Sequence, residues 1–213
     1  MKIQLTLYFL LGTLQALPLY STPKTTEQYV SVQYSPELKN SLRAIRNLKE
    51  GNKLICDILK QGALRLSVAK NECSVKFGAC WDPDRRIIFI NLSSHNSEEE
   101  IIASLIFELH NALKTPQFNQ LFSLATNQKI DKEKYVKSIE FIEYQNSIDT
   151  AALIKLGVEK KVFGKNTYVS TYNTFDEHYW YQKMSGHSAV HANNYDSLTA
   201  FNKSWKRKGY LRG

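Results

Sequence analysis

The chain has 213 residues, 43% of them hydrophobic, and a formal net charge of +8. This is enough apolar sequence for one ordinary globular domain, and the absence of repeats and biased tracts excludes a repeat or low-complexity protein. The positive charge favours anionic surface partners such as membranes and polysaccharides. No nucleic-acid-binding motif accompanies the charge, so we expect no specific nucleic-acid partner.

Residues 1–16 have the order of a secretory signal peptide. Lys2 supplies a positive charge, the mainly apolar run Ile3–Leu14 follows, and Ala16 is a small residue suited to cleavage. The apolar core is too short for a bilayer span, which takes about 20 residues. We therefore expect a secreted or periplasmic protein that has no transmembrane segment and begins near Leu17.

The chain has three cysteines, and export makes a disulfide possible. Cys73 and Cys80 lie seven positions apart around a predicted turn, which makes them the best pair. Cys56 would then be a free thiol. A cysteine zinc site is not expected, because the sequence has no Cys-x-x-Cys motif.

Hydrophobic periodicity and turn residues predict one α+β domain over residues 36–200. Residues 87–90 are apolar at every position, as in a central strand. We expect a small antiparallel or mixed sheet over residues 63–92, packed by several helices. In chain order, the expected segments are an exposed lead-in over 17–35, helices over 36–50 and 52–60, strands over 63–68, 75–81 and 87–90, helices over 98–114 and 131–156, an irregular region over 164–195 with helical character at 175–184, and a basic tail over 201–213.

The helix predicted over 98–114 begins with a capping box. The Ser97 hydroxyl can accept from a free backbone amide, and Glu100 can reach back to the amide of Ser97. Helical spacing turns Glu108 towards the apolar side of this helix, with Asn111 one turn later on the same side. A buried carboxylate is costly, so Glu108 should be partnered, protonated or at the floor of a cleft.

This helix resembles the active-site helix of the zincin metallopeptidases. In that family a strand precedes a helix with the motif His-Glu-x-x-His, whose histidines bind zinc and whose Glu activates the metal-bound water. The motif aligns on Phe107-Glu108-Leu109-His110-Asn111, and the resemblance covers about residues 63–115. It implies a zincin-like architecture with Glu108 as the catalytic base and with His110 and Asn111 beside it.

The sequence departs from the family at both zinc-binding positions. Phe107 cannot bind zinc, and Asn111 is a poor zinc ligand. The resemblance therefore implies a protein without a metal ligand set or bound zinc. Such a relative has lost hydrolysis or uses Glu108 for something else.

Two later segments offer further candidate ligands. By the same resemblance, Glu140 or Glu143 on the helix over 131–156 would supply a carboxylate ligand, although nearby lysines also fit a solvated face. His187 and His191 have the four-residue spacing that places two imidazoles on one helical face, where they could join His110, Glu177 or His178. Gly186 and the pair Asn193-Asn194 instead favour a loop.

Three functional hypotheses follow from these features. The first is an exported, zincin-like pseudo-peptidase, an effector or toxin-type domain that is not an active enzyme and binds a protein or anionic partner. The second is an active metal-dependent hydrolase with an unconventional site around Glu108. The third is a surface or adhesion protein that uses the aromatic residues of its C-terminal third. No Gly-x-Ser-x-Gly elbow or Gly-rich phosphate loop is present, which disfavours serine hydrolases and P-loop proteins.

Overall fold

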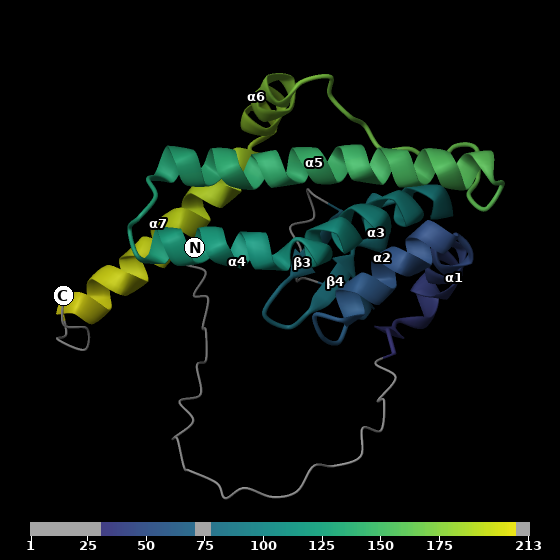
Figure 1. Cartoon of the computed structure of the whole chain (residues 1–213), viewed down its shortest axis with the longest axis horizontal. Coiled ribbons are helices and arrows are strands. Elements are labelled where there is room, and N and C mark those ends of the chain that lie inside the picture. The colour runs from purple at the N-terminus through teal and green to yellow at the C-terminus, as the bar shows by residue number, and fades with distance from the viewer. Residues whose placement is uncertain (1–30, 71–77, 208–213) are drawn as a thin grey trace, which may run out of the picture.

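The computed structural model describes residues 31–70 and 78–207 (Figure 1), so the expected signal peptide and Cys73 lie outside the described residues. The protein is α+β, as predicted, with a small mixed sheet and a larger set of helices. The elements in chain order are β1 (Gln33–Tyr34), the 3-10 helix η1 (Pro36–Leu38), α1 (Lys39–Asn47), α2 (Lys49–Leu59), β2 (Arg65–Val68), β3 (Ala79–Asp82), β4 (Ile87–Ile90), the 3-10 helix η2 (Leu92–Ser94), α3 (Glu98–Leu113), α4 (Thr115–Thr126), α5 (Lys132–Glu159), α6 (Phe175–Ser185) and α7 (His187–Arg207).

The sheet has the strand order β1-β2-β4-β3. β1 and β4 both pair with β2 in parallel, and β3 pairs with β4 antiparallel. All four residues of β4 are buried, which confirms the prediction of a central strand for Ile87–Ile90. The two-residue strand β1 was not predicted, because a pair of residues is too short for any alternation to be visible.

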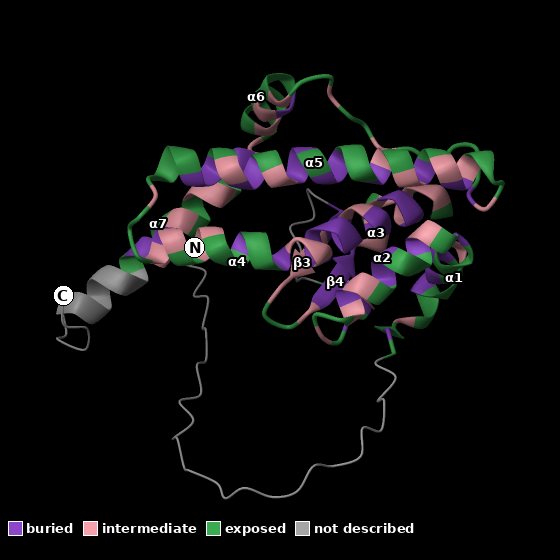
Figure 2. Ribbon diagram, in the orientation of Figure 1, coloured by how far each residue is buried: buried purple, intermediate pink, exposed green. Residues whose placement is uncertain are grey.

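Helix α3 occupies the middle of the molecule. It packs on β3 and β4 and also contacts α1, α2, α4 and α5, and most of its surface is buried (Figure 2). Its capping box forms in part. The Ser97 hydroxyl accepts from the amide of Glu100, but the Glu100 carboxylate accepts from the amide of Asn96 instead of Ser97. Because α3 packs against elements on several sides, its buried residues cover more than one face of the helix.

Helix α5 packs against both α3 and α7, and α7 passes behind α5 in the view of Figure 1. A second apolar core forms where α4, α5 and α7 meet, separate from the main core around the sheet and α3. Helix α6 stands on the outer side of α5, away from the sheet. The buried apolar residues of the second core are Phe118, Ala125, Tyr135, Val136 and Ile139.

Two predicted helix boundaries are wrong for local reasons. Gly51 does not end a helix but lies in the first turn of α2, where a side chain would meet the Ile45 carbonyl. Pro116 does not end the helical region either, because it lies in the first turn of α4, where a missing amide costs nothing. Similarly, α7 continues to Arg207 and so enters the region predicted as a basic tail.

Gly157 also lies inside a helix, α5, rather than closing it. A Cβ at this position would lie 2.1 Å from the ring of Phe163, which is buried in the main core. We expect Gly157→Ala to destabilise the protein, because overpacking costs about 1–3 kcal/mol and exceeds the gain of up to about 1 kcal/mol in helix propensity. Urea unfolding measures the difference. Gly157→Ala combined with Phe163→Leu should recover part of the loss, whereas a stabilised single variant would contradict this packing.

Cys80 is disulfide-bonded, and Cys56 is a free thiol exposed on α2. A disulfide through Cys56 is therefore excluded, in line with the prediction that this residue is free.

Among the described residues, no helix has the length and apolar character needed to cross a bilayer.

Candidate metal centre

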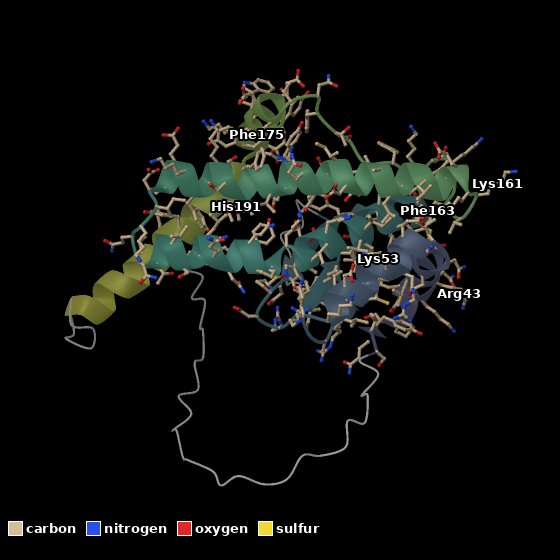
Figure 3. All side chains as sticks on the ribbon, in the orientation of Figure 1. Arg43, Lys53, Lys161, Phe163, Phe175 and His191 are labelled. Carbon is tan, nitrogen blue, oxygen red and sulfur yellow. The ribbon has the colours of Figure 1, made fainter. Side chains whose placement is uncertain are left out.

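Two helices each direct a pair of potential metal ligands to the same place. Glu140 and Glu143 lie three positions apart on α5, and His187 and His191 lie four apart on α7, spacings that place each pair on one helical face. The helices pack together, and Figure 3 shows His191 on the part of α7 beside α5. One ligand atom from each of these four residues lies within 4.8 Å of the other three. We call Glu140, Glu143, His187 and His191 the α5–α7 cluster.

Within the cluster, the His187 imidazole lies between the two carboxylates, and the Glu143 carboxylate lies between the two imidazoles. Nδ1 of His187 is 3.3 Å from Oε1 of Glu140 and 3.5 Å from Oε2 of Glu143. Nε2 of His191 is 3.7 Å from Oε1 of Glu143. These separations are long for charge-assisted hydrogen bonds, which are about 2.7–2.9 Å. They are close to the separation of about 3.3–3.4 Å between ligand atoms that lie about 2.0–2.1 Å from a tetrahedral ion.

Glu140 is fully buried and yet ionised. Burial raises its pKa, but the imidazoles of His178 and His187 and the hydroxyl of Ser188 lower it further, to about 2. The Ser188 hydroxyl donates to Oε1 of Glu140 over 2.7 Å. Burial lowers the pKa of His187, but the two cluster carboxylates raise it by more, so the net shift is upward. The neighbouring carboxylates therefore favour the protonated form of His187, which would place a positive charge beside Glu140.

Glu108 lies beside this cluster, on α3. It is buried, with 6% of its surface exposed, as the helical phase predicts. Burial is the main cause that raises the pKa of Glu108 to about 7, and the negative charge of Glu143 adds to it. The hydrogen bond from Asn111 and the charge of His187 act in the opposite direction. A carboxyl group that titrates near neutral pH has the property required of a general base.

Two amides hold the Glu108 carboxylate in place. Nδ2 of Asn111 donates to Oε2 of Glu108 over 2.9 Å, and Nδ2 of Asn146, from α5, donates to Oδ1 of Asn111 over 2.8 Å. Asn111 thus connects Glu108 to α5 through these two hydrogen bonds. The predicted proximity of Glu108 and Asn111 is confirmed.

His110 does not join the site. Its Nδ1 lies 3.0 Å from the hydroxyl of Thr150 and 3.0 Å from the carbonyl oxygen of Ile106, and burial lowers its pKa. It therefore connects α3 to α5 at a point further along α5 than the cluster. Phe107, which aligns with the first zinc-binding histidine of the zincin motif, is half-buried.

Two interpretations made from the sequence are wrong here. Glu140 and Glu143 do not lie on a solvated face, since 0% and 9% of their surfaces are exposed. The segment around His187 and His191 is not a loop. Gly186, with φ 82°, adopts the left-handed conformation that ends α6, and α7 begins at the next residue. Gly186 therefore separates two helices. Because His187 and His191 both lie in α7, their four-residue spacing places them on one face of that helix.

No protein-family model matches the chain, and neither curated proteins nor solved structures give a match.

Proposed function

We propose that the protein is a metal-dependent hydrolase that binds a divalent cation in the α5–α7 cluster and uses Glu108 as its general base. One observation carries the proposal. Two carboxylates and two imidazoles from two helices lie within 4.8 Å of one another, beside a buried carboxyl group with a pKa of about 7. The apolar segment over residues 1–16 adds export to the proposal.

The donor set fits zinc best among the common ions. Zinc takes imidazole nitrogens together with carboxylate oxygens, whereas calcium and magnesium take mainly oxygen ligands. Buried ionised carboxylates such as Glu140 supply the negative charge that a divalent cation needs. A divalent cation bound here would supply positive charge to offset these carboxylates.

A zinc ion held by the α5–α7 cluster would supply an activated water, because bound zinc lowers the pKa of water to about 7. Glu108 contributes the proton transfers. Its carboxylate accepts a proton from the attacking water and can return it to the leaving group. The amide pair Asn111 and Asn146 fixes the direction of this carboxylate, which a base needs in order to act at one position.

The resemblance to zincins supports the choice of Glu108 and suggests peptides as the substrate class. The ligands, however, come from α5 and α7 rather than from the helix that carries the base. This arrangement removes the objection raised by Phe107 and Asn111, because neither residue is needed as a ligand. The competing hypothesis is a metal-free pseudo-peptidase that binds a partner. Measuring whether the protein retains zinc tests both hypotheses.

We expect the full chain, dialysed against a slight excess of zinc and then desalted, to retain one zinc per chain by elemental analysis. His187→Ala and Glu143→Ala should each lose most of it, because each removes one of four ligands. Asn194→Ala is the matched control, since Asn194 is exposed on α7. Absence of zinc from the wild-type protein would overturn the metal centre and support the pseudo-peptidase hypothesis.

The hydrolase part of the proposal has its own test. The zinc-loaded protein should cleave a quenched-fluorescence peptide library, and a chelator should stop cleavage. Zinc retention without cleavage of the library, or of a comparable set of ester probes, would leave a metal-binding protein and overturn the assignment as a hydrolase.

A further inference from the structure

Helix α6 is exposed along most of its length but buries a single histidine. Trp180, Tyr181 and Met184 leave more than half of their surfaces in solvent, whereas His178 is 3% exposed and is the buried residue of this fully described helix. Histidine is a poor choice for filling space at such a position, because its two ring nitrogens need partners. The burial of His178 therefore calls for a polar partner.

Aromatic rings hold the His178 imidazole on several sides. Its centroid lies 5.5 Å from those of Tyr144 and Tyr172 and 6.4 Å from that of Phe175. Its Nε2 atom lies 3.6 Å from Oε2 of Glu140. In the part of the chain that the structure describes, neither ring nitrogen of His178 nor Oε2 of Glu140 has a hydrogen-bond partner. Nε2 of His178 and Oε2 of Glu140 thus face each other just beyond hydrogen-bond distance.

The two oxygens of Glu140 face different groups. Oε1 accepts from Ser188 and faces His187 in the α5–α7 cluster, whereas Oε2 faces His178 on the opposite side. Fixing Oε2 from the α6 side would fix which way Oε1 points. Carboxylates that bind metal ions are commonly held by such outer hydrogen bonds, and removing one typically weakens metal binding about 10–100-fold.

We propose that His178 is a positioning residue whose Nε2–H group binds Oε2 of Glu140 and holds Oε1 towards the cation. The inference rests on the proposed metal centre. It gives α6 a function within that centre: the helix does not contact the cation but carries the donor that orients one of its ligands.

Three substitutions separate this role from simple packing. His178→Gln places an amide donor near the position of Nε2, and His178→Asn carries the same group on a side chain too short to reach it. His178→Phe fits the aromatic surroundings but has no donor. We expect zinc affinity to fall about 10–100-fold in the Phe and Asn variants and to stay within about threefold of wild type in the Gln variant. Phe175→Leu, which alters the aromatic surroundings only, should leave the affinity unchanged.

Competition against a chromophoric zinc chelator measures the affinity, and cobalt substitution provides a second readout. The visible absorption of bound cobalt should change in the Phe and Asn variants and be restored in the Gln variant. Equal zinc affinity and an unchanged cobalt spectrum in all three would overturn the inference, even where melting temperatures differ. If the Phe variant does not fold, the difference in zinc affinity between the Gln and Asn variants tests the inference. A wild-type protein that binds neither metal would instead overturn the metal centre itself.

Discussion

Glu108→Gln should lower zinc-dependent turnover by about 100-fold or more, because a positioned general base contributes about 10²–10⁴ to the rate. Gln keeps the size of the side chain and can still accept the hydrogen bond from Asn111, but it cannot accept a proton. Zinc content should stay the same, since Glu108 is outside the α5–α7 cluster. Cleavage of the peptide library by variants with equal zinc content measures the effect. Unchanged turnover would remove Glu108 from the mechanism.

The same substitution should stabilise the zinc-free protein at pH 8. The pKa of Glu108 is about 7 in the folded state and 4.5 as a model value, so the folded state binds the proton more tightly than the unfolded state. Stability from the protonated carboxyl group is present below pH 4.5 and is lost as the pH rises to 7. The loss is at most about 3.5 kcal/mol, since one pKa unit corresponds to about 1.4 kcal/mol. Gln has no such loss.

Urea unfolding in the presence of a chelator tests this at pH 8 and pH 5. The gain in the Glu108→Gln variant should be about 2–3 kcal/mol at pH 8 and much smaller at pH 5. Glu159→Gln, an exposed change on α5, should show no such pH dependence. A variant that loses about 1–3 kcal/mol at pH 8 would instead identify Glu108 as a structural anchor held by hydrogen bonds.

Chelating the cation should lower the free energy of unfolding by about 4 kcal/mol when free zinc had been at about 1,000 times its dissociation constant. The ligands lie on two helices that are distant in the sequence, so the unfolded chain offers no formed site. Melting temperatures with zinc, with a chelator and after zinc is restored measure the effect. His187→Ala should melt at the same temperature in all three conditions. An insensitive wild-type protein would agree with the metal-free expectation drawn from Phe107 and Asn111.

The elements that the sequence predicts well are those whose signals are local. Alternation reveals the strand at 65–68, uniform apolarity reveals β4, and the Ser97 side-chain cap marks the start of α3. Helix α4 is missed because Pro116 reads as a stop, although proline is equally favourable in a first turn.

In the candidate site, too, the sequence predicts features that depend on one helix and misses those that depend on how helices pack. The burial of Glu108 follows from its phase on one helix, so the sequence alone predicts it. The pairing of Glu140 and Glu143 with His187 and His191 depends on how α5 and α7 pack, and no local pattern encodes that contact. His178 is harder still to predict, since it is a lone histidine on a mostly exposed helix. Its proposed role depends on its approach to Glu140, which lies on a different helix.

The order of these helices along the chain also sets the order in which the site is synthesised. All three carboxylates, Glu108, Glu140 and Glu143, precede residue 160, and His178, His187 and His191 follow it. At about 5–20 residues per second, the ribosome delivers the imidazoles a few seconds after the carboxylates. A nascent chain that ends with α5 therefore has the sheet, α3 and a set of acidic groups, but none of the nitrogen ligands. Metal capture at the proposed centre would therefore wait until α6 and α7 dock, and it would report that these helices have joined the rest of the fold.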